Sequence, residues 1–186
     1  MLFAPLAPLG RPPSDDVQEI AVPVEVQVPL LAKILSFDRN LAARSERELV
    51  LGVLFQRRYR TSANVADEVR DAVRRLPPGA VGGRRVRTVP IDLDDTPDLE
   101  TALGRNGVLV LYVAPLRAAD IRALASICRS LRVTSITGVP SYVESGVSVG
   151  IGVRGERPEI VINLVASRAE GADLNAQLLK LARIVE

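Results

Sequence analysis

Two hydrophobic patterns alternate along most of this chain. Runs of strand length that are rich in apolar residues occur at Leu49–Phe55, Arg85–Leu93, Val108–Val113 and Val133–Val139. Between them, apolar residues recur every three or four positions, as on one face of a helix, in Val24–Leu41, Ala63–Leu76, Asp94–Leu103 and Ala118–Leu131. This alternation is typical of a parallel sheet covered by helices on both faces. We therefore predict a single three-layer α/β domain with a mostly parallel, doubly wound sheet.

The end of the chain departs from this alternation. Apolar residues occupy every second position in Val147–Val153 and again in Ile160–Leu164, and Gly155–Pro158 lies between the two segments. Such a pattern predicts an antiparallel hairpin that closes the sheet. In Asp173–Glu186 the apolar residues return to helical spacing, so we predict a C-terminal helix that packs on the sheet.

Proline and serine positions suggest where the elements begin. Pro29 fits best in a first helical turn, so we expect the first helix to start close to it. Ser62 is the expected N-cap of the next helix. Residues 1–22 are rich in proline, and are interpreted either as a disordered leader or as the remnant of a signal peptide. The folded domain is then expected to span residues 23–186.

Composition excludes several classes of function. The chain has no histidine, so it cannot build a Ser-His-Asp or Cys-His site by itself. Its one cysteine, Cys128, cannot form an intrachain disulfide and is expected to be a small buried hydrophobe. The net charge is only +2 and arginine is spread along the chain, which does not indicate a nucleic-acid binder. No apolar segment is long enough to span a bilayer, and no cofactor-binding motif is present.

Doubly wound sheets bind ligands beyond the carboxyl ends of their strands. One loop at that expected position contains Arg57, Arg58 and Arg60 just before a helix, and is interpreted either as an anion site or as a solvated basic turn. A second loop carries the acidic run Asp92–Asp95, which could bind a hard cation but is better explained by charges at the start of a helix.

A third loop, Gly138–Gly146, is the expected interaction surface. It contains Pro140, Ser141, Tyr142 and Glu144 between two predicted strands. Tyrosine is enriched at the energetically important points of protein interfaces, so Tyr142 is the first candidate for a partner contact. The alternative is that Tyr142 packs over the end of the sheet.

The order of these elements resembles the YfiR family. The first helix, Leu30–Leu41, is followed by the strand Leu49–Phe55. The segment Ile136–Val153 (ITGVPSYVESGVSVGIGV) looks like the strand, loop and strand of that family, and Glu159–Val185 (EIVINLVASRAEGADLNAQLLKLARIV) resembles its final strand, turn and helix. The resemblance covers Val24 to Glu186.

The resemblance implies regulation, not catalysis. Members of the family are small periplasmic regulators, and the type member represses a membrane diguanylate cyclase by protein contact. The implied partner is therefore a membrane-bound signalling protein of cyclic-di-GMP signalling or a sensor kinase, and a second copy of the chain in a homodimer is also considered. The resemblance implies no cofactor and no enzymatic activity. A small-anion-binding α/β domain and an enzyme of unknown class remain as alternatives.

Overall fold

The computed structural model describes residues 20–45 and 47–185 of the 186-residue chain. Most of the expected leader, residues 1–19, lies outside the described residues. Val22, by contrast, is buried in the core, and Pro23 caps the first helix.

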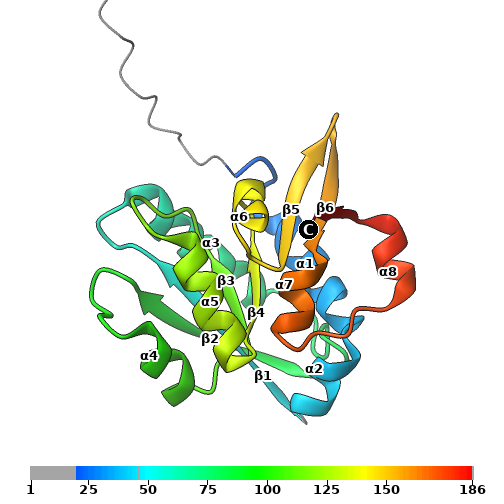
Figure 1. Ribbon diagram of the computed structural model, residues 1–186, viewed down its shortest axis with the longest axis horizontal. Coiled ribbons are helices and arrows are strands. Elements are labelled where there is room, and N and C mark those ends of the chain that lie inside the picture. Colours follow the sequence, from blue (N-terminus) through cyan, green and yellow to red (C-terminus); the bar gives the residue numbers. More distant parts are fainter. Residues whose placement is uncertain (1–19, 46, 186) are drawn as a thin grey trace, which may run out of the picture.

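One sheet holds the described part of the chain together (Figure 1). Its strands run in the order β2-β1-β3-β4-β5-β6-β7. Their bounds are β1 Glu48–Phe55, β2 Arg85–Asp92, β3 Val110–Val113, β4 Thr134–Thr137, β5 Val149–Arg154, β6 Arg157–Asn163 and β7 Arg183–Val185. Neighbouring strands are parallel except for the β5–β6 hairpin, which is antiparallel. The predicted α/β class, with a mostly parallel sheet that ends in an antiparallel hairpin, is confirmed.

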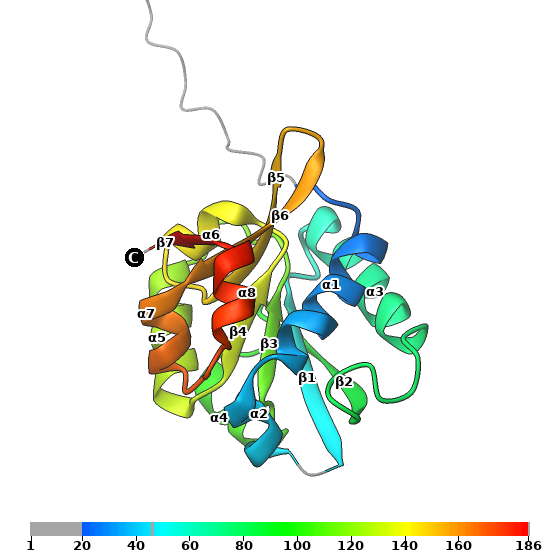
Figure 2. The same ribbon diagram turned by 90° about the vertical axis from the view of Figure 1, so that its right-hand side faces the viewer.

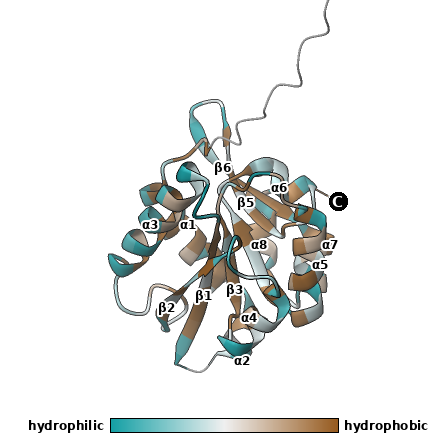
Figure 3. Cartoon of the chain, turned by 90° about the vertical axis from the view of Figure 1, so that its left-hand side faces the viewer, coloured by the Kyte–Doolittle hydropathy of each residue, from teal (hydrophilic) through white to brown (hydrophobic). Residues whose placement is uncertain are grey.

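Helices cover both faces of the sheet, so the domain has three layers (Figures 1 and 2). One face carries α1 (Val24–Ser36), α2 (Arg39–Arg44), α3 (Arg60–Arg74) and α8 (Ala176–Leu181). The other face carries α4 (Leu99–Arg105), α5 (Ile121–Leu131), α6 (Pro140–Glu144) and α7 (Leu164–Ala169). The hydrophobic colour in Figure 3 is concentrated on the strands between the two layers. Strand β3 lies between β1 and β4 and is buried along its whole length, as predicted from its apolar sequence.

Buried polar groups fasten α1 to the sheet. Gln27 on α1 is fully buried, and its side-chain oxygen accepts a hydrogen bond from the hydroxyl of Tyr112 on β3 at 3.1 Å. Its amide nitrogen donates to the Val22 carbonyl. The amide lies against Gly138, where a Cβ would collide with the Gln27 side-chain oxygen. A side chain at position 138 would therefore displace Gln27 and break its buried hydrogen bond with Tyr112.

Two expected helix starts are wrong. Helix α1 begins at Val24 and contains Pro29 within it. Pro29 is tolerated because it lies on the exposed side of α1, where water can satisfy the carbonyl group that loses its helical partner. Helix α3 begins at Arg60, before Ser62, and the Ser62 hydroxyl instead accepts a hydrogen bond from the Gln56 N–H at 3.0 Å.

The predicted C-terminal helix is also too long. Helix α8 is only six residues, starts at the N-cap Asn175 and ends at Leu181. Residues Arg183–Val185 pair with β6 as a parallel strand. The β-branched Ile184 and Val185 favour this extended conformation, although their spacing also fits a helical stripe.

Shortening Leu111 in β3 should test the burial of the central strand. We expect Leu111→Ala to lower the free energy of unfolding by about 2–5 kcal/mol, because Leu111 is fully buried and leaves a cavity. Val165→Ala, at a residue that is 65% exposed, is the matched control and should change it by less than about 0.5 kcal/mol. Equal denaturation midpoints for Leu111→Ala and the wild type would contradict this packing.

Candidate functional site

The predicted basic loop contacts the predicted acidic loop. Arg57 Nε donates to Asp92 Oδ2 at 2.7 Å, and the Arg58 N–H donates to Asp94 Oδ2 at 2.9 Å. Burial of Asp92 opposes its ionisation, but hydrogen bonds from Arg57 and the Asp94 N–H outweigh this and hold the pKa of Asp92 below its usual value. The carboxylate in turn raises the pKa of Arg57. The charge of Arg57 is therefore already compensated within the chain.

Doubly wound sheets usually bind a ligand at the carboxyl ends of the two strands where the strand order reverses, which here are β1 and β3. In this protein, residues of the chain itself bridge that position. Gln56 Nε2 donates to the Arg117 carbonyl at 3.2 Å, and the Arg117 N–H donates to Gln56 Oε1 at 2.6 Å. The Arg117 guanidinium also lies 4.6 Å from the centre of the Tyr59 ring. These contacts tie the loop after β1 to the loop after β3.

The expected Gly138–Gly146 loop is largely helical, because Pro140–Glu144 form α6. Tyr142 belongs to this helix and its side chain is buried. Its hydroxyl oxygen accepts a hydrogen bond from the Leu116 N–H at 2.8 Å. Burial raises the pKa of Tyr142 to about 12. This burial favours the alternative that Tyr142 packs over the end of the sheet and does not contact a partner. Of the other residues expected at this surface, Ser141 and Glu144 are exposed and Pro140 is half-buried.

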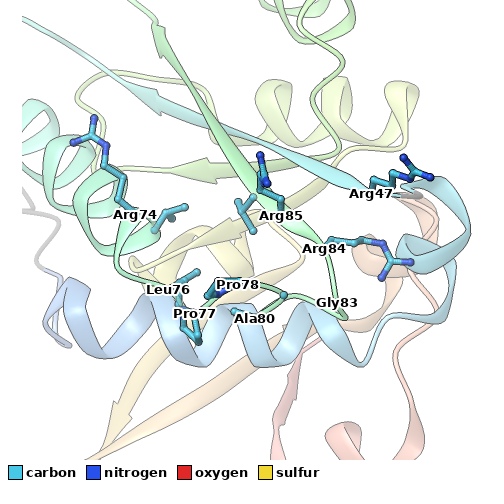
Figure 4. A pocket seen from close by; sticks show the side chains of 12 residues that line it. Arg47, Arg74, Leu76, Pro77, Pro78, Ala80, Gly83, Arg84 and Arg85 are labelled. Carbon is cyan, nitrogen blue, oxygen red and sulfur yellow. The ribbon is translucent and has the colours of Figure 1, made fainter.

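A cavity of about 490 Å³ lies beside the start of β2 and the loop Pro77–Gly83 (Figure 4). Arg47, Arg74, Arg84 and Arg85 are among the residues that line it. Figure 4 shows the Arg74 and Arg85 side chains pointing away from the loop, and the Arg74 guanidinium pairs with Asp71 at 2.6 Å. Arg84 donates to the carbonyl groups of Ser45 and Gly82. The guanidinium groups of Arg74 and Arg84 are therefore already paired within the protein.

A second groove lies between α1, α8 and the β5–β6 hairpin. Its volume is about 300 Å³, and we call it the hairpin groove; it is lined by Leu30, Arg154, Arg157, Pro158, Glu159, Ile160 and Leu181. In Figure 2, α1 and α8 lie on the same face, and the hairpin extends beyond both helices.

Exposed apolar side chains surround the hairpin groove. Leu181 is 77% exposed, Val153 41% and Ile184 39%. Val153 lies on the face of β5 that carries the buried Ile151, and Ile184 pairs in register with Ile162. These strand residues therefore face the layer of α1 and α8 but are left uncovered there. Sequence reasoning missed this surface because it expected the apolar residues of Asp173–Glu186 to pack on the sheet as one helix.

Ion pairs connect the strands and the helix next to the hairpin groove. Glu159 on β6 forms ion pairs with Arg154 and, at 3.3 Å, with Arg183 of β7. Arg183 also lies 3.8 Å from Glu144 of α6. Arg183 thus links Glu144 of α6, on the other face of the sheet, to Glu159 of the groove.

Glu170 is a buried carboxyl group that the sequence did not reveal. It follows α7, is fully buried, and contacts Ser135 and Ser148. Burial raises its pKa to about 7. Cys128 is buried too, and burial raises the pKa of its thiol well above the ordinary value, so it is not an activated nucleophile.

Within residues 20–45 and 47–185, no cluster of three or more His, Cys, Asp or Glu side chains has a geometry suited to a metal ion. In the same residues, no helix has the length and apolar content needed to cross a membrane.

Residues 26–183 match the family model described as YfiR/HmsC-like. No curated protein matches the chain.

Solved structures with the same fold come from several bacteria. A conserved domain protein from Vibrio cholerae has a TM-score of 0.62 and 15% identity, covering 88% of this chain and 60% of that one. The ABC domain in complex with L-Trp from Streptococcus pneumonia has a TM-score of 0.61 and 14% identity, covering 88% and 62%. A substrate binding protein with adhesive properties from Clostridium difficile, ligand-free and open, has a TM-score of 0.57 and 16% identity, covering 89% and 60%.

The chain spans about three fifths of the length of each of these structures. At such identities the likeness shows the fold alone.

The hydroxyl of Tyr142 should contribute to stability. We expect Tyr142→Phe to lower the free energy of unfolding by about 1–3 kcal/mol, because the buried Leu116 N–H loses its acceptor. Tyr59→Phe keeps the ring beside Arg117 and should change it by less than about 0.5 kcal/mol. Equal effects of the two substitutions in urea denaturation would show that the Tyr142 hydrogen bond is not stabilising.

Proposed function

We propose that this chain, which belongs to the YfiR/HmsC-like family, is a regulatory protein that acts by direct contact on a membrane-bound signalling protein. The observation that carries the proposal is the family match over residues 26–183, which includes the sheet, helices from both layers and the hairpin groove. The partner is either a diguanylate cyclase of cyclic-di-GMP signalling or a sensor kinase. The proposed location is the periplasm, where the family members that this chain resembles act.

Regulation by contact agrees with the finding that the side chains considered for chemistry are paired or buried within the fold. Arg57 pairs with Asp92, Cys128 is buried with a raised pKa, and Gln56 and Arg117 bridge the place between β1 and β3. These groups serve the fold, so we propose no catalytic step and no cofactor for the chain.

The hairpin groove is the proposed partner surface. Protein interfaces combine an apolar centre with a polar rim, and Leu181 and Val153 beside Arg154 and Arg157 have that arrangement. The edge strand β7 adjoins the groove and can offer backbone hydrogen bonds to a partner. Ser141 and Glu144, expected at the interaction surface, lie on α6 on the other face of the sheet, and Arg183 links Glu144 to Glu159 of the groove.

Placing a charge on the groove should test this surface. We expect Leu181→Asp to weaken the regulatory contact at least tenfold, because an unpaired carboxylate at an apolar interface costs more than about 1.4 kcal/mol. Val165→Asp is the matched control, since Val165 is exposed and apolar but lies on α7, on the opposite face. Each membrane cyclase and sensor kinase of the same genome is co-expressed with the chain, and signalling output is measured.

The wild-type chain should change the output of one such protein, Val165→Asp should act like the wild type, and Leu181→Asp should lose the effect. Equal activity of the two variants would contradict the assignment of the groove, and an output that the wild type never changes would contradict the proposed function. Sedimentation of the purified variants distinguishes a homodimer: a wild-type dimer that Leu181→Asp dissociates would place a second copy on the groove.

A further inference from the structure

Glu170 sits in a closed set of buried hydrogen bonds. Its Oε2 accepts from the Ser135 N–H at 2.8 Å, and its Oε1 accepts from the Ser135 hydroxyl at 2.6 Å. The Ser148 hydroxyl lies within hydrogen-bond distance of Glu170 Oε2 and also, at 2.8 Å, of the Ser135 carbonyl oxygen. All three side chains are fully buried.

The number of hydrogens in this set favours a protonated carboxyl. A serine hydroxyl has one hydrogen, so an ionised Glu170 and the Ser135 carbonyl compete for the hydrogen of Ser148. When Glu170 carries a proton, it can donate to Ser148, and Ser148 can donate to Ser135. Protonation therefore satisfies every bond in the set, whereas an ionised Glu170 and the Ser135 carbonyl must share the one hydrogen of Ser148.

Neighbouring charges oppose this effect only in part. From α5, Arg129 favours the ionised carboxylate, and the thiol of Cys128 is the other titratable group there. From α2, Arg44 lies 3.5 Å from the Glu170 carbonyl oxygen and 3.3 Å from the Thr134 hydroxyl. The side chain of Arg132 packs beside Gly171, and the exposed Arg168 is on α7 itself. Burial raises the pKa of Glu170 to about 7 and outweighs both these charges and the hydrogen bonds from Ser135 and Ser148, which also favour the carboxylate.

This set of hydrogen bonds lies where the parallel sheet meets the hairpin. Strands β4 and β5 pair at only two positions, Ile136 with Val149 and Thr137 with Gly150. Ser135 and Ser148 lengthen this junction through side-chain bonds, since the Ser148 N–H donates to Ser135 Oγ at 2.9 Å. The Ser148 carbonyl then accepts from the Asn163 N–H of β6 at 2.9 Å. Glu170 thus links β4 to the residue that precedes β5, and the backbone of that residue, Ser148, continues the connection to β6.

We propose that protonation of Glu170 controls how firmly the β5–β6 hairpin is held to β4, which makes the hairpin groove a pH-sensitive surface. The consequence for a partner rests on the proposed function, whereas the loosening of the hairpin does not. Because the folded pKa is raised, the stabilisation is complete below the unfolded value near 4.5 and is lost as the pH rises through about 7. The hairpin is therefore held firmly in acid and loosely in mild alkali.

Hydrogen exchange of the hairpin amides at pH 5.5 and pH 8, corrected for the intrinsic rates, tests the proposal. We expect their protection in the wild type to fall about thirtyfold between the two pH values, since the rise from pH 5.5 to a folded pKa of about 7 spans about 1.5 units at a factor of ten per unit. Glu170→Gln, which is neutral at both values, should show less than about a twofold change. Glu100→Gln, at an exposed glutamate of α4 away from the hairpin, is the matched control and should behave like the wild type.

The carboxyl carbon of Glu170, observed by NMR in the wild-type chain, gives a second measurement that does not depend on the folding of a variant. A titration midpoint near 7 supports the proposal, and a midpoint near 4.5 overturns it. Hairpin protection that does not depend on pH, or that depends on it equally in Glu170→Gln, also overturns it. Neither measurement involves a partner, so failure of the proposed function would leave these results unchanged.

Discussion

The arrangement of this protein depends on one constraint, which is that a parallel sheet with apolar residues on both faces must be covered on both faces. Strand β3 is the clearest case, because it is buried along its whole length between two helical layers. The same constraint is only partly met at the other end of the sheet. The hairpin extends beyond α1 and α8 (Figure 2), and α8 has only six residues, so Val153 and Leu181 remain exposed. The proposed partner surface is therefore the part of the sheet that the chain does not cover itself.

Buried polar groups connect the layers at three places. Gln27 holds α1 to β3 through Tyr112, Tyr142 holds α6 to the loop after β3, and Glu170 joins β4 to the hairpin. Each group is satisfied by a specific partner, and each would be costly if that partner were lost. These hydrogen bonds fix how each helical layer is positioned on the sheet, because they form in only one arrangement. Contacts between valine and leucine side chains alone would allow more arrangements. Among these groups, only Glu170 titrates near neutral pH.

Hydrophobic patterns predicted the strands and their class well, because β1, β3 and the β5–β6 hairpin have sequences whose period leaves few alternatives. They failed where a tertiary contact decides the local structure. Ser62 could cap a helix but accepts a hydrogen bond from Gln56, and Leu181 has helical spacing but lies exposed at the end of the short α8. The burial of Glu170 could not be predicted, because only the fold brings it to Ser135 and Ser148. Likewise, the pairing of Arg57 with Asp92 depends on the adjacency of β1 and β2.

The central claim, that the hairpin groove contacts a membrane signalling protein, is tested most directly by cross-linking in living cells. A photoreactive amino acid replaces Leu181 in one strain and Val165 in another, and cross-linked proteins are identified after illumination. The account predicts that position 181 cross-links to an integral membrane cyclase or sensor kinase, and that position 165, on the opposite face, does not. Cross-linking of such a protein from position 165 but not from position 181 would contradict it.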